Sequence, residues 1–425
     1  MSATVHFPLD YSRPVQRDQV HSSVYTNPQV FEDELDRIFR RGWVYVGHES
    51  EVAAYGDFVT RMIGLQSVVL ARDKSGGCKV LYNRCPHRGN KVCQVEKGHA
   101  KTFTCSYHGW AFGMDGALAA VPFPKGYGDD FDHSRHGMVP VPRVESYGGF
   151  VFASLAAEGE TLKQHLGEGA RMIDMLNGLS PEGGIELRAG WMKHRLDANW
   201  KVPSENQVDG YHAQFVHGSL VRANQAWAKV RDRREESTAR TRDLGAGHSE
   251  IDHAADYAEA GTVFRWTGGV DPARLPTYVA AMKQAYGEEE AHRRLVLGPP
   301  HAAIFPNLML AEMNISILQP VSATETLQLT TPVMLKGGAE LNPRSLRRCE
   351  GALGPAGFLI ADDAEVNALL QQGLATEQPE WVVLKRGLHS EKHEEDGSIS
   401  AGLMDETSQR GLWRRYRELM TAGAK

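Results

Sequence analysis

The chain has 425 residues, with 47 basic and 53 acidic side chains and a formal net charge of -6. That balance excludes a nucleic-acid binder held by phosphate neutralisation, which would need a basic surface. No apolar run approaches the ~18 residues of a membrane span, so we expect no membrane association. The N-terminal stretch has no basic region followed by an apolar core, and we therefore expect a cytoplasmic protein.

The first predicted element is an amphipathic helix near the N-terminus. Asn27 and Pro28 supply a helix cap and a first-turn proline. Apolar side chains then follow at helical spacing, and the helix is expected to end before Gly42; the apolar positions are Phe31, Leu35, Ile38 and Phe39. We expect residues 1–48 to form a helical segment that packs on the C-terminal part of the chain.

The next segment pairs cysteine with histidine twice. Cys85 and His87 stand in CPHRG, and Cys105 and His108 stand in CSYHGW. Thiolate and imidazole are metal ligands, and two such pairs can close a site. Structural zinc sites usually pair like with like, as C-x₂₋₄-C and H-x₃₋₅-H. Here each pair mixes one Cys with one His, which favours a Rieske [2Fe–2S] cluster over zinc.

The surroundings of these pairs predict a β domain. Residues 66–71 and 79–82 read as two strands, and DKSGG at 73–77 reads as the turn between them. Short strands and frequent glycines continue to Gly149. We expect the cluster domain to occupy residues 49–155.

A second constellation of metal-ligand types follows in NWKVPSENQVDGYHAQFVH. It contains Glu205, Asp209, His212 and His217. Two histidines and a carboxylate form the facial triad of non-haem Fe(II) oxygenases. His212 and His217 are five residues apart, about 140° around a regular helix. They can meet at one metal only if the helix bulges or unwinds, and Gly210 is a candidate weak point. Otherwise one histidine is buried and the other exposed.

A third ligand must come from elsewhere, and GPAGFLIADDAEVNALLQQG at 354–373 is the candidate segment. Leu359, Val366 and Leu370 give an apolar helical stripe, with Asp362 and Asp363 at its edges. A carboxylate directed into a core needs a partner, which a metal would provide. Periodicity does not choose between the two aspartates, and an acidic first turn favoured by the helix dipole is the alternative explanation.

The rest of the C-terminal part reads as scaffold. Residues 185–191 alternate as a strand, and residues 302–334 read as antiparallel strands broken at Pro306 and Pro320. Leu412, Tyr416 and Leu419 form the stripe of a C-terminal helix.

Together these motifs resemble the large (α) subunits of Rieske non-haem iron aromatic-ring-hydroxylating oxygenases. The resemblance rests on CPHRG and CSYHGW, on ENQVDGYHAQFVH and on GPAGFLIADD, in the family's order. The phrase ENQVDGYH and SYGGFVFASL at 146–155 are similar to the benzoate, anthranilate and terephthalate branch, and ETSQRGLWRRYRELM at 406–420 is similar to terephthalate- and salicylate-hydroxylating members. The resemblance implies an α+β fold with an all-β Rieske domain beside a catalytic domain, residues 156–425, in which helices cover an antiparallel sheet (helix-grip, START-like).

The resemblance also implies a role for each residue of the motifs. Cys85, His87, Cys105 and His108 would hold the [2Fe–2S] cluster. His212, His217 and Asp363 would hold a mononuclear Fe(II). Asp209 matches the aspartate that links a cluster histidine of one subunit to an iron histidine of its neighbour. A homotrimer of α subunits is therefore implied, with or without a small β subunit (α₃β₃).

The implied function is that of a terminal oxygenase component. Electrons pass from the cluster to the mononuclear iron, which activates O₂ for cis-dihydroxylation of an aromatic substrate, an aromatic acid or amine. The chain has no G-x-G-x-x-G dinucleotide fingerprint, so we expect electrons to come from a separate reductase. The resemblance implies that this reductase carries a flavin and a [2Fe–2S] cluster, draws on NAD(P)H, and acts with or without a ferredoxin. The alternatives are a Rieske monooxygenase or demethylase, and a non-catalytic electron-transfer protein.

One departure concerns the substrate. Relatives that act on benzoate-type acids carry an arginine on the strand at 315–320, whereas this strand has no basic residue. An acid would need another cation, because a buried carboxylate is best paired with arginine. Arg222 and Arg265 are candidates, and a neutral or amino-substituted aromatic is therefore more open than the nearest resemblance suggests.

Overall fold

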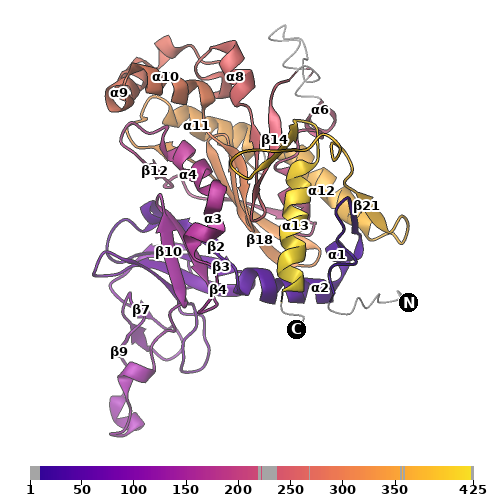
Figure 1. The fold of residues 1–425 in the computed structure, drawn as a ribbon. Helices are drawn as coiled ribbons and strands as arrows, with labels where there is room; N and C mark the ends of the chain where they lie inside the picture. The colour runs from indigo at the N-terminus through magenta and orange to yellow at the C-terminus, as the bar shows by residue number, and fades with distance from the viewer. Residues whose placement is uncertain are drawn as a thin grey trace. The chain divides into compact units, whose positions relative to one another are not determined.

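The computed structural model describes residues 10–218, 222, 237–267, 269–354, 357 and 359–422. The chain forms two compact units (Figure 1): one is Phe39–Leu162, and the other combines Met1–Ile38 with Lys163–Lys425. The N-terminal segment therefore belongs to the unit that carries His212 and Asp363, and not to the unit that carries the Cys/His pairs.

The smaller unit is built from short antiparallel strands in three sheets, as expected for an all-β domain. One sheet has the order β5-β4-β3-β6 (Cys78–Tyr82, Gln66–Arg72, Asp57–Ile63, Lys97–His99). The second has the order β10-β11-β2 (Arg143–Tyr147, Phe150–Ser154, Val44–His48). The third has the order β7-β8-β9 (Phe103–Thr104, Ala111–Phe112, Leu118–Ala120). Single 3₁₀ turns connect them: η2 Glu49–Val52, η3 Pro124–Tyr127 and η4 His133–Arg135.

The predicted hairpin at 66–82 is confirmed by β4 and β5. Its turn depends on Asp73, whose Oδ1 accepts hydrogen bonds from the backbone N–H of Ser75 (2.9 Å) and of Gly77 (3.0 Å). Gly76 has a φ of 80°, which glycine adopts without a steric cost. An aspartate that bonds the backbone two residues on is the usual way to start such a turn.

The larger unit contains a nine-stranded antiparallel sheet of order β13-β19-β18-β17-β16-β15-β14-β23-β22. In that order the strands are Met192–Leu196, Glu325–Pro332, Asn314–Ser322, Leu308–Ala311, His301–Ile304, His248–Asp252, Arg240–Gly245, Ile399–Gly402 and Lys392–His393. Two small pairs complete the strands, β1–β21 (Gln19–His21, Trp381–Val383) and β12–β20 (Ile185–Glu186, Met334–Leu335).

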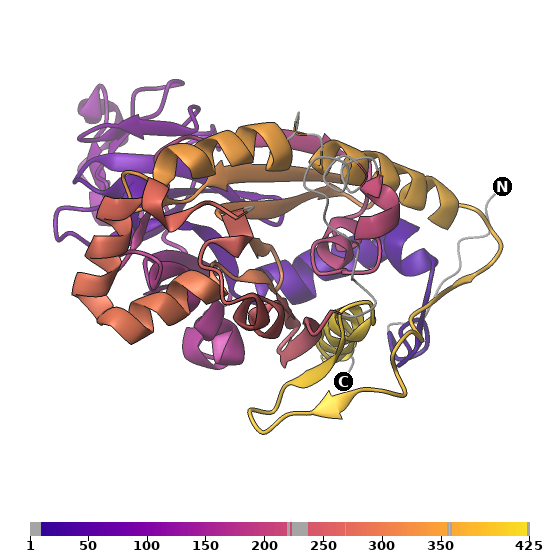
Figure 2. The same ribbon diagram turned by 90° about the horizontal axis from the view of Figure 1, so that it is seen from above.

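Helices of this unit cover the sheet and its ends. The α-helices are α1 Ser23–Thr26, α2 Pro28–Glu34, α3 Leu162–Leu166, α4 Ala170–Asn177, α5 Lys201–Asn206, α6 Ala213–Val216, α8 Ala254–Ala260, α9 Pro276–Tyr286, α10 Glu288–Leu297, α11 Asn342–Arg348, α12 Ile360–Leu374 and α13 Thr407–Thr421. Single turns are η5 Gly167–Gly169, η7 Arg265–Thr267 and η8 Pro272–Arg274, and π-helical segments are η1 Leu35–Arg40 and η9 Cys349–Leu353. Figure 2 shows α11 and α12 following one another along the sheet.

The strand register shows that α12 and α13 pack on one face of the sheet. Side chains of paired residues lie on the same face. Thr241 of β14 contacts Ser408 of α13 through their hydroxyls, and the same face continues across β15, β16 and β17 through Asp243↔Ser249, Ser249↔Ala303 and Ala303↔Met309. From Met309 the face passes to Ser316 of β18, and Leu318 lies on the same face because it is two residues further along that strand. Leu318 pairs with Gln328 of β19, and Gln328 pairs with His194 of β13, which lies beside α12. The expected helix-covered antiparallel sheet is therefore confirmed.

The apolar stripe predicted for 359–370 is wrong. The buried side chains of α12 are Asp363, Asn367 and Gln371, and Leu370 is 47% exposed. This polar face packs towards α5, where Gln371 Oε1 accepts a hydrogen bond from the backbone N–H of Asn199 (2.8 Å). Specific hydrogen bonds therefore outweigh the apolar spacing in the orientation of this helix.

Two strand predictions need smaller corrections. Only Ile185–Glu186 of the expected strand at 185–191 is extended in a sheet. Pro320 does not break the chain of strands but lies inside β18, beside a register shift between Pro320 and Ser322. A bulge tolerates a residue that cannot donate a ladder hydrogen bond. The C-terminal helix is confirmed by α13, with Leu412 and Tyr416 buried.

The predicted N-terminal helix is confirmed, and its last α-helical residue anchors a buried polar network. Asn27 caps α2 by accepting a hydrogen bond from the backbone N–H of Gln29 (2.8 Å). Glu34 is fully buried and accepts from Lys201 Nζ (2.6 Å), Trp200 Nε1 (2.8 Å) and Tyr416 OH (2.7 Å). These contacts join α2 and α13 to the start of α5, the helix that leads to Asp209.

Replacing Lys201 with methionine should destabilise the larger unit. The change leaves Glu34 buried without its cation, and breaking a buried ion pair costs about 3–5 kcal/mol. The measurement is urea denaturation followed by tryptophan fluorescence. The double variant Lys201→Met with Glu34→Gln should recover much of the loss, and a loss below about 1 kcal/mol for Lys201→Met alone would contradict the role given to the pair.

Glu205, further along α5, is the second buried anchor. Its carboxylate accepts hydrogen bonds from Trp413 Nε1 (2.5 Å) and Tyr25 OH (3.0 Å). Burial raises the pKa of Glu205 to about 7, although both hydrogen bonds oppose the rise.

The raised pKa of Glu205 predicts a pH dependence of stability. Between about pH 4.5 and 7 the folded state holds a proton that the unfolded state has lost, so this group lowers the free energy of unfolding as the pH rises. The variant Glu205→Gln should therefore gain stability relative to the parent protein from about pH 5 to about pH 8, as measured by urea midpoints. The exposed Glu365→Gln is the control and should show no such trend; equal trends in both variants would contradict the assignment.

Candidate metal centres

The Cys85 and Cys105 loops share one backbone geometry. In each loop the cysteine N–H donates to the carbonyl five residues on, that of Asn90 or Trp110 (2.8 Å each). The glycine four residues on donates back to the cysteine carbonyl, from Gly89 or Gly109 (2.9 Å each). These glycines have φ values of 76° and 73°, which favour glycine. The recurrence of glycine after each Cys/His pair therefore has a conformational cause.

The four side chains are brought together at the ends of these loops. Cys85 and Cys105 are both buried, and the rings of His87 and His108 lie 4.6 Å apart between centroids. Trp110 stacks on His87 at 5.0 Å, which fixes the plane of that imidazole. His87 Nδ1 is buried and has no hydrogen-bond partner among the described residues, as expected of a nitrogen that awaits a metal.

The two thiols differ in their electrostatic surroundings. Burial raises the pKa of Cys85. Burial also acts on Cys105, but hydrogen bonds from the backbone N–H of Tyr107 and from Asn90 outweigh it and lower the pKa of that thiol. Asn90 Nδ2 lies 3.6 Å from the Cys105 Sγ. Such N–H donors stabilise a thiolate, the form that binds iron.

Within the part of the chain that the structure describes, one group of three metal-ligating side chains has all its ligand atoms within 4.8 Å of one another. It consists of His212, His217 and Asp363. The Cys/His set does not meet that condition, so its four ligands do not converge on a single ion. A binuclear cluster, with ligands spread over two irons, fits these positions better than zinc.

The three-residue group is centred on one carboxylate oxygen. Asp363 Oδ1 lies 3.4 Å from His212 Nε2 and 3.3 Å from His217 Nε2. Asp363 comes from the buried face of α12, and the two histidines flank the single turn of α6. A 2-His-1-carboxylate set with free positions is the site of non-haem Fe(II) oxygenases.

The opposite nitrogen of each imidazole faces a second carboxylate. His212 Nδ1 lies 3.3 Å from Asp209 Oδ2, and His217 Nδ1 lies 3.5 Å from Asp362 Oδ2. The neighbouring aspartates of α12 thus take different positions: Asp363 faces both Nε2 atoms, whereas Asp362 faces the far side of one ring. Spacing alone could not separate them. Carboxylates behind metal-bound histidines orient the rings and raise their basicity.

Charge at this site also favours a cation. Burial lowers the pKa of His212, but Asp209 and Asp363 outweigh burial and raise it to about 9. Burial raises the pKa of Asp363, but both histidines outweigh it and lower the value to about 2. Three carboxylates around two imidazoles leave an excess of negative charge in a half-buried place, which a divalent ion would balance.

The histidines meet because the helix is interrupted. The chain leaves α5 at Asn206 and enters α6 at Ala213, so the expected unwinding is present, whereas the π-bulge is not: the π-helical segments are at Leu35–Arg40 and Cys349–Leu353. Gly210 lies in this break, where an added Cβ would stand 2.4 Å from the Leu403 carbonyl oxygen. Close packing is therefore the reason for glycine there.

An apolar wall borders the break. Val208 packs with Ala303, Met309 and Leu318 of the sheet. His301 Nε2 of β16 donates a hydrogen bond to the carbonyl of Gln207 (2.6 Å). This bond fixes the backbone two residues before Asp209. Sequence reasoning left Asp362 and Asp363 as alternatives for one ligand and did not find His301, because the contacts that separate them depend on tertiary structure.

The two arginines considered for a substrate carboxylate lie elsewhere. Arg265 is in η7, with its guanidinium 5.9 Å from the ring centroid of Tyr257, and Arg222 is exposed. Neither contacts the three metal-ligating residues.

Comparisons with known proteins agree with this geometry. Residues 42–145 match the model of the Rieske [2Fe–2S] domain, and residues 186–422 match that of the ring-hydroxylating α subunit catalytic domain. Toluate 1,2-dioxygenase subunit α of Pseudomonas putida is 32% identical over 88% of this chain and 85% of its own. The anthranilate 1,2-dioxygenase large subunit of Acinetobacter baylyi is 31% identical over 87% of this chain and 80% of its own. These relatives confirm the benzoate/anthranilate branch.

The fold agrees as well. The structure of naphthalene 1,2-dioxygenase with indole in its active site superposes with a TM-score of 0.82 at 26% identity, over 98% of this chain and 95% of that one. No helix in the described ranges is both long and apolar enough to cross a bilayer. The paired Cys/His loops, the His-His-Asp group and the matches to both domains lead to one conclusion: the chain belongs to the Rieske ring-hydroxylating dioxygenases, as an α subunit that carries a [2Fe–2S] domain and a catalytic domain using mononuclear non-haem iron.

Proposed function

We propose that this chain is the terminal oxygenase component of a multicomponent system that cis-dihydroxylates a substituted benzene of the aromatic acid or amine class. The observation that carries the proposal is the convergence of His212, His217 and Asp363 on one point. An electron carrier needs no such site. A monooxygenase or demethylase would share it, but the relatives named above are dioxygenases.

The proposed ligands follow the geometry. Cys85 and Cys105 would hold one iron of the cluster, and His87 and His108 the other. The proposed cluster domain is Phe39–Leu162, somewhat longer than the expected 49–155 because Val44–His48 pairs with Phe150–Ser154, and Met1–Ile38 with Lys163–Lys425 forms the proposed catalytic part. His212, His217 and Asp363 would hold the mononuclear iron. When bound, the cluster supplies electrons one at a time and the mononuclear iron supplies the activation of O₂.

The chain's own residues position these groups and shape the pocket. Asp209 and Asp362 hold the rings of His212 and His217 through their Nδ1 atoms. The apolar wall around Val208 excludes water beside the iron ligands. The net reaction adds both atoms of O₂ to the arene and takes up two electrons and two protons.

Electrons would come from a separate flavin and [2Fe–2S] reductase, with or without a ferredoxin. The names of the relatives, "subunit alpha" and "large subunit", support an assembly of several chains. We propose a cytoplasmic α₃ or α₃β₃ assembly, in which Asp209 links a cluster histidine of one subunit to His212 of its neighbour.

The direct test is isotope labelling. Reduced enzyme, supplied with ¹⁸O₂ and an aromatic acid or amine, should give a cis-diol that carries two labelled oxygens. A product with one labelled oxygen would assign a monooxygenase, and oxygen-independent electron transfer without any product would assign the carrier.

Alanine variants of the two aspartates of α12 should differ in iron content. Asp363→Ala should lose about one iron per chain, because it removes the oxygen that both Nε2 atoms face. Asp362→Ala should keep that iron with an affinity about 10–100-fold lower, the usual cost of losing an outer-shell partner. Iron analysis of dialysed protein makes the measurement, and the cluster's visible spectrum shows that folding is intact. Greater iron loss in Asp362→Ala than in Asp363→Ala would make Asp362 the ligand and contradict the assignment.

Asp209→Ala should leave both metal centres bound and lower turnover by about 100-fold, because it removes a link between imidazoles and not a ligand. The measurement combines iron and sulfide analysis with substrate-dependent oxygen uptake. Unchanged turnover would refute the linking role, and an iron site that stays empty even at saturating Fe(II) would make Asp209 a ligand.

A further inference from the structure

A stripe of neutral polar side chains crosses the sheet beside the proposed iron site. It consists of Asn314 and Ser316 of β18 with Gln328 and Thr330 of β19, and we refer to it as the polar stripe. All four are at least nine-tenths buried, with exposed fractions of 4, 7, 4 and 3%. Polar residues in a sheet interior need hydrogen-bond partners, and buried ones without them are unusual.

The strand register places the polar stripe on the side of the sheet that faces the iron ligands. Ser316 pairs with Met309 and Gln328 pairs with Leu318, so each shares a face with its partner. Met309 and Leu318 pack against Val208, the residue before Asp209. The stripe and the metal-binding segment therefore lie on the same side of β17, β18 and β19.

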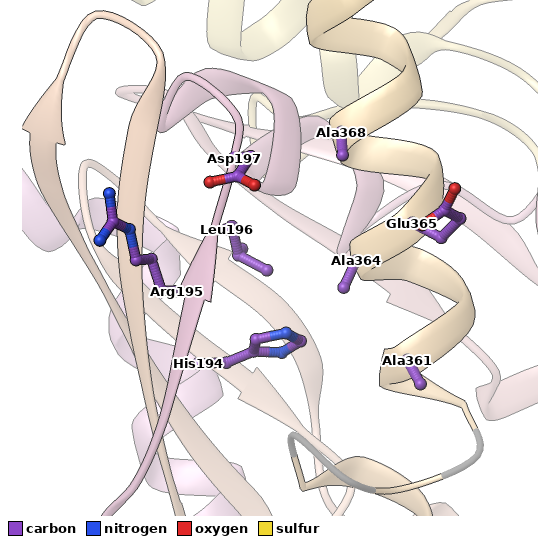
Figure 3. Close-up of a pocket in the computed structure, with 8 residues that line it drawn as sticks. All are labelled: His194, Arg195, Leu196, Asp197, Ala361, Ala364, Glu365 and Ala368. Carbon is purple, nitrogen blue, oxygen red and sulfur yellow. The ribbon is translucent and has the colours of Figure 1, made fainter.

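The helix that carries Asp363 covers the same face. His194 of β13 pairs with Gln328 and extends the stripe to the sheet edge. Figure 3 shows His194 and Leu196 pointing towards α12, whereas Arg195 points away. A cavity of about 260 Å³ lies between them and α12, where the helix contributes the short side chains Ala361, Ala364 and Ala368. Its rim is charged, because Arg195, Asp197 and Glu365 also line it. Space therefore lies at the sheet edge next to the stripe, at His194 and beside α12, the helix that carries Asp363.

The stripe has unused hydrogen-bonding capacity. The Ser316 and Thr330 hydroxyls bond each other (2.8 Å), and Gln328 Nε2 donates to Thr330 Oγ1 (3.4 Å). Asn314 Oδ1 and His194 Nδ1 are buried and have no hydrogen-bond partner among the described residues. Asn314 is 96% buried on a face that leads to the proposed iron, so a ligand there would be its natural partner.

The stripe contains no cation. On this face, β13, β19, β18, β17 and β16 carry no lysine or arginine. Arg348, on the neighbouring α11, already forms a fork with both carboxylate oxygens of Glu312. Burial lowers the pKa of His253 to about 4 and also lowers that of His301, so both imidazoles are neutral. Within the described ranges, these strands would offer a carboxylate buried against this face no lysine or arginine as a counter-ion, and burying an unpaired carboxylate is costly.

We propose that the polar stripe is the substrate-recognition surface of this site, and that it selects an uncharged arene with a hydrogen-bonding substituent, such as a carboxamide or an amine, over an aromatic carboxylate. The inference rests on the proposed function, since it names the substrate class of the same site. Amide groups both donate and accept, as the asparagine, glutamine and hydroxyl groups of the stripe require.

The test uses matched probes that differ in charge and little in shape. Benzamide and benzoate form one pair, and 2-aminobenzamide and 2-aminobenzoate form the other; at pH 7 each acid is ionised and each amide is not. Isothermal titration calorimetry on the anaerobic, metal-loaded enzyme should give each amide a Kd at least about 10-fold below that of its acid.

Variants of the stripe residues test whether the stripe causes the preference for amides over acids. Asn314→Leu and Gln328→Leu should each weaken amide binding about 10-fold, because they remove the hydrogen bonds and leave an apolar side chain of similar size. Gln319→Leu is the matched control, since Gln319 lies on β18 but on the opposite face. It should leave both amide Kd values within about 2-fold. Iron content and circular dichroism show that each variant is folded.

Two results would overturn the inference: acids that bind as tightly as their amides, or amide binding unchanged in both stripe variants. These outcomes are separable from failure of the proposed function. An enzyme that dihydroxylates arenes but prefers acids refutes the stripe alone. An enzyme that prefers amides and forms no diol refutes the reaction and leaves the recognition surface standing.

Discussion

Negative charge concentrated at one point organises the catalytic unit. Asp363 Oδ1 faces the Nε2 atoms of two imidazoles, and Asp209 and Asp362 lie behind the rings. Three carboxylates are stable together only if cations balance them, and a divalent ion does so more completely than protonated histidines. The chain must therefore interrupt a helix between α5 and α6 and orient α12 by a polar face, because these are the changes that bring the five groups together.

The scaffold around this point is held by buried polar contacts as well as by apolar packing. Glu34 receives three hydrogen bonds from side chains of α5 and α13 and their surroundings, and Glu205 receives two. Such networks add less stability than well-packed apolar groups would, but each has one geometry that satisfies all its members. In this chain they fix the direction of α5 and hence the position of the segment that follows it.

The sequence predicted chemistry better than packing. Mixed Cys/His spacing identified Cys85, His87, Cys105 and His108 as a set because ligand chemistry depends on local turns. The hairpin at 66–82 and the Asn27 cap were also predictable, since both are local. The orientation of α12 was not, because the hydrogen bond between Gln371 and Asn199 joins residues far apart in the chain. The separate positions of Asp362 and Asp363 needed the same tertiary information. The polar stripe could not be predicted for a related reason, because only the register between β18 and β19 brings its four residues together.

By its family, one chain holds two different iron centres. Acid-labile sulfide and total iron, measured per chain on anaerobically purified protein with its EPR spectrum, test it most directly. A chain with both centres should contain about three irons and two sulfides, with a Rieske-type signal on reduction. Zinc without sulfide would contradict it, because the Cys/His loops would then hold a structural ion and supply no electrons to the site at Asp363.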